Sequence, residues 1–559
     1  MRNRSLTLIV LVALGLCGIG SLSQNSVKAQ VTTATPSPTP TVTPTTVKPV
    51  QTLDSLKSVI AARLARAEVR RGRVGVKIVS LNTGKVVYEQ DADKYFMPAS
   101  NMKNFTVATA MERLGPDYKF VTRVYAPSQP DSNGTIKGDL RILGGGDVSI
   151  STAFFGTSPT DPETYYKGID RLVDAIAAAG VKRVEGNIVG DESRFKGFAI
   201  PSTWEWDDLQ WYYGAEVSAL PINDNAVDLS VTPGAVGSPC VINISPAPAT
   251  SLYKIVNTCT TSAANVKRSL GVNKAIDRNV LEISGTLPVG DKGFSDSITI
   301  THPADLFVAM LKQRLEKRGI TITGITRTVR DFRQMISELP INQCSRAAST
   351  SDCVIQKPVE IGKLESVPFR EVAAKTMKPS QNMFTETILW TLGEEERNRI
   401  QIPTIDAANP PQRADSADLG LGVVKKFLTS IGIPEDAVVQ HDGCGMSRHD
   451  VITPSAVVAL YTYMAKQSPN AQAWRDSLTI GGVDGTLANR FKGTAAAGNI
   501  RGKTGTIDQV SALSGYMSTV GGEQVVLSLI VNGVPEGRQR TSLIDDIVIA
   551  VANFDGKID

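Results

Sequence analysis

Apolar positions recur at helical spacing where the regular part of the chain begins. Steps of three and four residues predict an amphipathic helix whose apolar face carries Leu53, Leu56, Ile60 and Leu64. Two apolar runs follow at 74–79 and 86–88, and the Asn-Thr-Gly sequence at 82–84 between them is typical of a turn. The opening of the folded chain therefore predicts a helix followed by a β-hairpin.

The end of the chain shows the complementary pattern. Residues 513–519 and 525–531 predict two strands joined across Gly521 and Gly522. A helix with one apolar face follows, formed by Leu543, Ile547, Ala550, Val551 and Phe554. An α/β sandwich that uses both chain ends to close one sheet would explain this symmetry.

The middle of the chain, from about residue 118 to 365, is dominated by short strand patterns and turns. One helix is predicted there, at 305–318 after Pro303. We predict mostly β inserted domains, one formed by 118–130 and 216–365 and a second by 131–215 nested within it. The flanking segments 53–117 and 366–559 then form a single domain.

The first 29 residues have the pattern of a cleaved export signal. Arg2 and Arg4 precede a stretch at 6–20 dominated by apolar residues and glycine, which is shorter than the roughly 20 residues that span a bilayer. The Val-Lys-Ala sequence at 27–29 fits a cleavage site, with an uncleaved anchor as the alternative. Residues 30–52 are rich in Thr and Pro and predict an extended spacer. We expect an exported protein of the periplasm or cell envelope.

Composition narrows the function classes. Among 559 residues, 59 Lys and Arg face 55 Asp and Glu, so a formal charge of +4 gives no reason to propose a nucleic-acid partner. Only three histidines occur and there is no Cys-x-x-Cys pair, so we expect neither a metal site nor a cofactor. Cys240 with Cys259 and Cys344 with Cys353 could form two local disulfides, or all could be free thiols, and Cys444 is left over either way.

Three short motifs carry candidate chemistry. Ser100 and Lys103 form Ser-x-x-Lys, which places both side chains on one face at a helix start, where a buried lysine can activate a serine. Ser380 and Asn382 form Ser-x-Asn, which presents a hydroxyl and an amide from one loop. The Lys-Thr-Gly-Thr sequence at 503–506 precedes a strand pattern, where a lysine offers a charge for a carboxylate. Each motif alone is more often a helix start, a cap or a turn.

In this order the three motifs resemble the signature set of penicillin-binding proteins and serine β-lactamases. Ser100 and Ser380 lie 280 positions apart, and this large insertion is typical of class C low-molecular-weight penicillin-binding proteins, the D-alanyl-D-alanine carboxypeptidase/endopeptidase family. Further stretches resemble that family and extend the resemblance from about residue 53 to the C-terminus: LGGGD at 143–147, WEWDDL at 204–209, YGA at 213–215, DGCGMSR at 442–448 and DGTL at 484–487.

The resemblance implies an α/β fold, in which a transpeptidase domain has helices flanking an antiparallel sheet beside a helical subdomain. It implies that Ser100 attacks a D-alanyl-D-alanine bond of a peptidoglycan stem peptide, that Lys103 is the base, and that Ser380 relays a proton to the leaving amine. Substrate contacts are implied for Asn382, Lys503, Thr504, Gly505 and Thr506. The backbone N–H groups of Ser100 and Thr506 would hold the oxyanion.

The resemblance also implies that β-lactams acylate Ser100 as inhibitors. We expect the inserted domains to orient the protein on the wall or to contact proteins of cell-wall synthesis. The balance of carboxypeptidase and endopeptidase activity, the preferred stem peptide and the oligomeric state stay open. Two other functions remain alternatives: a serine β-lactamase, and a wall-binding or sensing protein that is acylated without turnover.

Two positions depart from the family pattern. Gln381 stands at the middle of Ser-x-Asn, where the family usually has Asp, and we expect tuning of activity rather than its loss. Cys444 stands where the family usually has Ser, so the thiol either makes activity redox-sensitive or is a small buried substitute for serine.

Overall fold

The structure is a computed structural model that describes residues 51–156, 161–330, 358–400 and 415–558. The predicted signal peptide, nearly all of the predicted spacer, Cys344 and Cys353 lie outside these residues. No helix in the described part of the chain is long and apolar enough to cross a lipid bilayer.

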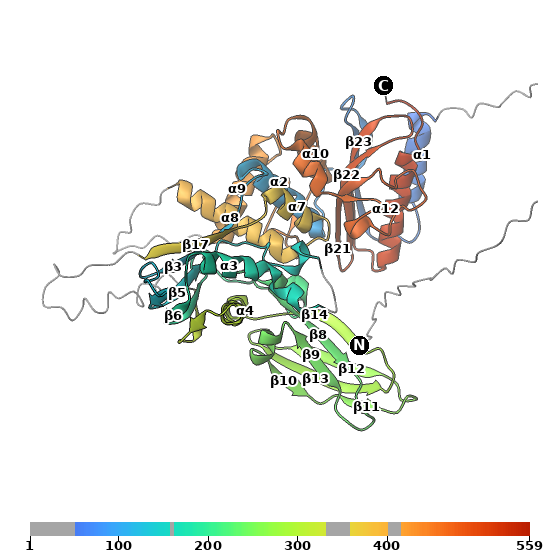
Figure 1. The fold of residues 1–559 in the computed structure, drawn as a ribbon. Coiled ribbons are helices and arrows are strands. Elements are labelled where there is room, and N and C mark those ends of the chain that lie inside the picture. Colours follow the sequence, from blue (N-terminus) through green and yellow to red (C-terminus); the bar gives the residue numbers. More distant parts are fainter. Residues whose placement is uncertain (1–50, 157–160, 331–357, 401–414, 559) are drawn as a thin grey trace, which may run out of the picture. The chain divides into compact units, whose positions relative to one another are not determined.

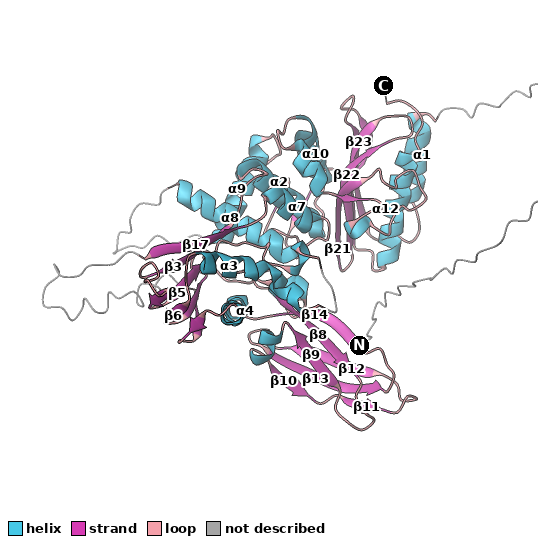
Figure 2. Ribbon diagram, viewed as in Figure 1, coloured by secondary structure: helices cyan, strands magenta, loops and turns pink. Residues whose placement is uncertain are grey.

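A six-stranded antiparallel sheet joins the two ends of the chain (Figures 1 and 2). The N-terminal hairpin lies beside the C-terminal hairpin, with Val76 opposite Leu529. The predicted sandwich closed by both chain ends is therefore confirmed. In spatial order the strands are β2 (Val86–Gln90), β1 (Arg73–Ser80), β23 (Gln524–Asn532), β22 (Val510–Ser518), β21 (Arg501–Ile507) and β20 (Thr479–Ile480).

Alternating side chains of this sheet enter two separate cores, as the two-residue period of a strand requires. Leu513 and Leu527 pack with helices α1 (Leu53–Leu64) and α12 (Gly537–Ala552) on one face. Ala512 and Tyr516 point to the opposite face and join the core of the helical group. Figure 1 shows the sheet between these two layers.

The helical group packs around α2 (Lys103–Arg113), which is buried along almost its whole length. Helix α10 (Pro454–Lys466) covers the sheet, and the Tyr516 hydroxyl donates a hydrogen bond to the carbonyl oxygen of Tyr461 on this helix (2.6 Å). The remaining elements of this group are α7 (Phe369–Met377), α8 (Asn382–Arg399), α9 (Ser416–Ser430), β18 (Val438–Val439), β19 (Val451–Ile452) and α11 (Ala471–Ser477).

The long insertion after α2 begins with a mixed sheet packed against two helices, α3 (Lys167–Ala178) and α4 (Pro303–Lys317). Helix α4 confirms the helix predicted after Pro303. The five-stranded sheet has the order β16 (Thr326–Val329), β7 (Ile188–Asp191), β5 (Leu140–Leu143), β3 (Val121–Ala126) and β17 (Val359–Glu365). A second sheet consists of β15 (Thr321–Ile322), β6 (Arg183–Glu185) and β4 (Thr135–Lys137).

Residues 226–299 form the β-rich part of the insertion. One sheet contains β14 (Phe294–Thr299), β8 (Ala226–Thr232) and β9 (Val241–Ser245), and the other contains β10 (Lys254–Asn257), β13 (Val280–Pro288), β11 (Thr260–Ser262) and β12 (Ser269–Lys274). A disulfide joins Cys240 to Cys259, so of the two alternatives left open for this pair the structure shows the disulfide. The predicted domain boundaries stay a proposal; strands from 131–215 share the five-stranded sheet with strands from 118–130 and 216–365.

Candidate active site

Ser100 and Lys103 meet at the start of α2. Ser100 lies in a short 3-10 turn (Ala99–Met102), and the α-helix begins at Lys103, so the predicted helix start is a turn that runs into a helix. The three-residue step still brings the two side chains together. Lys103 Nζ hydrogen-bonds to Ser100 Oγ at 3.0 Å. Ser100 is partly exposed, whereas Lys103 is fully buried.

Two uncharged oxygens hold the Lys103 amine in place. Its Nζ donates hydrogen bonds to Asn382 Oδ1 (2.6 Å) and to the Cys444 carbonyl oxygen (2.9 Å). Burial lowers the pKa of Lys103, and nearby acidic groups oppose this effect, namely Cys444, Asp442, Glu386 and Asp450. Lys103 forms no ion pair within the described residues, so its deprotonated form is more accessible than that of a solvent-exposed lysine.

Ser380 and Asn382 flank the N-terminus of α8. Ser380 has a left-handed backbone (φ 69°), and its Oγ lies 2.8 Å from Lys503 Nζ. Gln381 caps the helix, because its side-chain oxygen accepts a hydrogen bond from the Met383 N–H (3.3 Å). The predicted loop is correct for Ser380, but Asn382 is already the first helical residue.

Strand β21 brings the third motif against the turn that carries Ser100. Lys503 is fully buried; burial lowers its pKa well below its usual value, and the charge of Lys103 adds to this. A Cβ on Gly505 would lie 2.4 Å from the Pro98 carbonyl oxygen, so only glycine lets the strand approach so closely. Thr504 Oγ1 donates to Thr486 Oγ1 (2.7 Å), whereas Thr506 is exposed.

The structure therefore gathers the three predicted motifs into one hydrogen-bonded cluster. Lys103 hydrogen-bonds to Ser100 and to Asn382. Lys503 hydrogen-bonds to Ser380. The exposed Thr506 and the partly exposed Ser100 and Ser380 form the solvent-accessible side of the cluster.

Asp442 and Glu386 are site residues that the sequence analysis missed. Asp442 shapes the loop that supplies the Cys444 carbonyl, because its oxygens accept hydrogen bonds from the N–H groups of Cys444, Gly445 and Ser447. The Trp204 indole also donates to Asp442 Oδ2 (2.8 Å) from the insertion. Glu386 follows Asn382 by one helical turn, and that four-residue spacing is the signal that could have found it.

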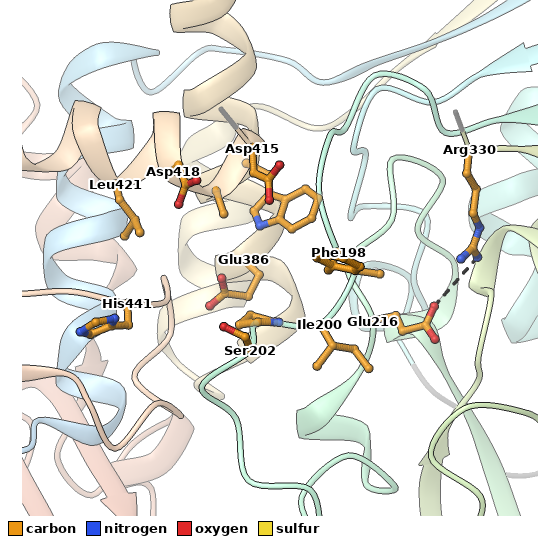
Figure 3. Close-up of a pocket in the computed structure, with 14 residues that line it drawn as sticks. Phe198, Ile200, Ser202, Glu216, Arg330, Glu386, Asp415, Asp418, Leu421 and His441 are labelled. Atoms are coloured by element: carbon orange, nitrogen blue, oxygen red, sulfur yellow. Dashed lines mark ion pairs between the residues drawn. The ribbon is translucent and has the colours of Figure 1, made fainter. Parts of the chain in front are cut away.

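Glu386 is a buried acid close to Lys103. Burial, with a further contribution from Asp442, raises the pKa of Glu386 to about 8. Its side chain also lines a cavity of about 390 Å³ together with Trp390 and His441. Figure 3 shows Glu386 and His441 at this cavity. No predicted site residue lines this cavity, so it is not where the three motifs meet.

Glu386, Asp442 and Cys444 place ligand atoms within 4.8 Å of one another, as a metal would require. Both oxygens of Asp442 already accept hydrogen bonds, and the Lys103 amine contacts the same loop. We therefore assign no metal to this group.

The fold and the site together define a serine peptidase of the penicillin-binding type. The chain belongs to the D-Ala-D-Ala carboxypeptidase 3 (S13) family, whose model matches residues 56–338 and 345–553. The predicted family and fold class are thus confirmed.

Relatives and solved structures agree with this assignment. A D-alanyl-D-alanine carboxypeptidase of Actinomadura sp. (strain R39) is 29% identical over 515 residues, which is 90% of this chain and 86% of the relative. D-alanyl-D-alanine carboxypeptidase DacB of Haemophilus influenzae is 22% identical and covers 87% of this chain and 91% of its own. The crystal structure of penicillin binding protein 4 from H. influenzae matches with a TM-score of 0.69 at 21% identity, covering 88% of this chain and 98% of that one.

Proposed function

We propose that this protein is a penicillin-sensitive serine DD-carboxypeptidase that hydrolyses D-alanyl-D-alanine bonds of peptidoglycan stem peptides through an acyl-enzyme on Ser100. The observation that carries the proposal is the 3.0 Å contact between Ser100 Oγ and the buried Lys103 Nζ. A serine hydroxyl is a weak nucleophile until an adjacent base removes its proton. Family membership supports the substrate class.

Acylation begins when neutral Lys103 accepts the hydroxyl proton of Ser100. The Ser100 oxygen then forms a bond to the carbonyl carbon of the penultimate D-alanine, and the carbonyl oxygen takes the negative charge. The backbone N–H groups of Ser100 and Thr506 stabilise this oxyanion. Asn382 binds the substrate backbone and holds Lys103 beside the reacting atoms.

The peptide bond then breaks. Ser380 donates a proton to the leaving amine of the terminal D-alanine and is reprotonated from the Lys103 side of the site, so no net proton is consumed. Lys503 and Thr504 bind the terminal carboxylate, with Gly505 and Thr506 giving the substrate strand close approach. Because burial lowers the pKa of Lys503, a bound carboxylate supplies the negative charge that favours its protonated form.

Deacylation completes the cycle. Lys103 accepts a proton from water, the resulting hydroxide attacks the acyl carbon, and the Ser100 oxygen regains a proton as the shortened peptide leaves. β-Lactams enter the same site because they carry an amide carbonyl and a carboxylate at matching positions. A relative from H. influenzae has been solved in complex with a β-lactam, which supports this part of the proposal.

We place the activity outside the cytoplasm, in the periplasm or cell envelope, on the basis of the N-terminal export pattern. Opening of cross-links, as an endopeptidase, uses the same chemistry on a different leaving amine. The direct test is release of D-alanine from an acylated peptide ending in D-Ala-D-Ala. Wild-type protein should release one D-alanine per peptide and Ser100→Ala none; release by both would refute Ser100 as the nucleophile.

A further inference from the structure

The insertion contacts the second motif of the active site at its middle residue and at its last residue. Asn382 Nδ2 donates a hydrogen bond to the Tyr213 carbonyl oxygen (2.9 Å). Gln381 Nε2 donates to Asp224 Oδ2 (2.8 Å). Tyr213 and Asp224 both belong to the insertion, so the segment that carries Ser380 and the first residue of α8, Asn382, is held from outside the helical group.

Asp224 is itself held firmly. Ser151 Oγ donates to its other carboxylate oxygen (2.5 Å). Asn223, Asp224 and Asn225 all have left-handed backbones, with φ of 45°, 63° and 54°. Such a run persists only where neighbours fix it, and the Asn225 side chain does so by donating to the Glu216 carbonyl oxygen (2.8 Å) and accepting from the Ile222 N–H (3.0 Å).

Gln381 passes this restraint to the motif. One end of its amide donates to Asp224, and the other end accepts the Met383 N–H at the start of α8. Its backbone N–H donates to the Thr376 carbonyl oxygen (2.9 Å). With both ends of its side chain engaged and only 7% of its surface exposed, Gln381 has one rotamer that satisfies its surroundings.

We propose that Asp224 is a positioning residue for the reaction: through Gln381 it fixes the left-handed turn that aims Ser380 at Lys503 and Asn382 at Lys103. The insertion is therefore part of the active site and not only a module for the wall or for partners. This inference rests on the proposed function, because it assigns a residue to the same acylation step.

The chemistry of the contact makes the inference testable. Gln381 is an N–H donor to a carboxylate, so a carboxylate at position 381 would face Asp224 without a donor between them. Two carboxylates in a partly buried site repel each other unless they share a proton. Adding Asp224→Asn would restore this hydrogen bond with its direction reversed, because the amide of the new side chain would donate to the carboxylate at position 381. The amide oxygen could still accept the hydrogen bond from Ser151.

The test uses two isosteric substitutions, Gln381→Glu and Asp224→Asn, each alone and both combined in a double variant. The second-order rate of acylation by benzylpenicillin is measured by intact-protein mass at mildly alkaline pH, where proton sharing is least favoured. Gln381→Glu should slow acylation by about 100-fold, the order of magnitude expected when a catalytic group is displaced by about 1 Å. The double variant should recover to within a few-fold of wild type.

Glu395→Gln provides the matched control. Glu395 lies on α8 and forms an ion pair with Arg194 of the insertion (2.7 Å), remote from the three motifs. This variant should lower the melting temperature without changing the acylation rate. If Gln381→Glu fails to fold, folding and acylation of the double variant still reveal the coupling.

If Gln381→Glu is acylated at the wild-type rate, the inference is wrong. It is also wrong if the double variant folds but is acylated no faster than Gln381→Glu. An absence of acylation in wild-type protein would instead refute the proposed function, so the two failures are distinguishable.

Discussion

Lys103 Nζ lies 2.6 Å from Asn382 Oδ1, although 279 positions separate the two residues in the chain. An amide oxygen fixes the amine without the full negative charge that a carboxylate would bring. The lysine can therefore be held rigidly beside Ser100 and still lose its proton, which is what a general base requires.

Replacing Lys103 with methionine should separate its chemistry from its packing. Methionine has a similar volume and no proton to transfer, so the acylation rate should fall by about 10²- to 10⁴-fold, the usual contribution of a general base. The free energy of unfolding should fall by about 1–3 kcal/mol, because Asn382 Oδ1 and the Cys444 carbonyl oxygen lose a buried donor while the loss of a desolvated amine offsets part of this cost. Stopped-flow acylation and thermal melts measure both quantities, with the exposed Lys466 changed to methionine as the control. Unchanged acylation by Lys103→Met would remove this lysine from the mechanism.

The pH profile of acylation should depend on Glu386. Below a pH of about 8 its carboxyl is neutral, because burial raises its pKa to about 8. Above that pH it ionises, raises the pKa of Lys103 and keeps the base protonated. Acylation by wild-type protein should therefore level off or decline through this range, whereas Glu386→Gln should continue to rise. Parallel profiles for the two proteins would contradict this coupling.

Glu386 should also make stability depend on pH. Its folded-state pKa lies above the ordinary carboxyl value, so its contribution to stability is fully present below the unfolded-state pKa and is lost as pH rises toward about 8. The melting temperature of Glu386→Gln minus that of wild type should grow across this window. A difference that does not change with pH would show that Glu386 is not the titrating group.

Gly505→Ala should disturb the approach of β21 to the nucleophile turn. The new Cβ would meet the Pro98 carbonyl oxygen at 2.4 Å, and backbone atoms cannot rotate away as a side chain can. We expect at least about a tenfold loss of acylation, since a shift near 1 Å costs about 100-fold, together with a cost of about 1–3 kcal/mol in stability. Gly422→Ala on α9 is the control, because its Cβ meets no atom within 4 Å.

Cys444 should prove inert in the folded protein. The thiol is fully buried, and burial followed by the charge of Asp442 raises its pKa well above its usual value, so little reactive thiolate forms. Iodoacetamide should leave Cys444 unmodified in peptide maps of the native protein, and Cys444→Ser should keep acylation within about threefold. Alkylation of Cys444 with loss of activity would instead support the redox-sensitive alternative.

Local patterns predicted the sheet and the motifs well. The helix at 53–64, both terminal hairpins and their union in one sheet follow from apolar spacing, which reports directly which side of each element is buried. Ser100 and Lys103 needed only a three-residue step to meet. The helix, the hairpins and the Ser-x-x-Lys step depend on neighbours in the chain, which a sequence displays directly, whereas the union of the two chain ends was inferred from their complementary patterns.

Features that depend on distant segments could not be predicted in the same way. Asp224 reaches Gln381 across 157 positions, and the Trp204 indole reaches Asp442 across 238. Neither pair has a periodic signature, since each forms only once the insertion has packed on the helical group. Glu386 is intermediate, because its spacing from Asn382 was visible but its burial was not.

Intact-protein mass after exposure to benzylpenicillin, with wild type beside Ser100→Ala, tests whether Ser100 is the nucleophile. We expect one penicilloyl adduct on wild type, located on the peptide that contains Ser100 and lost slowly, and none on the variant. Slow loss also distinguishes a peptidase from a β-lactamase, which would release the adduct quickly. An adduct on both proteins, or on neither, would contradict the assignment of Ser100 as the nucleophile.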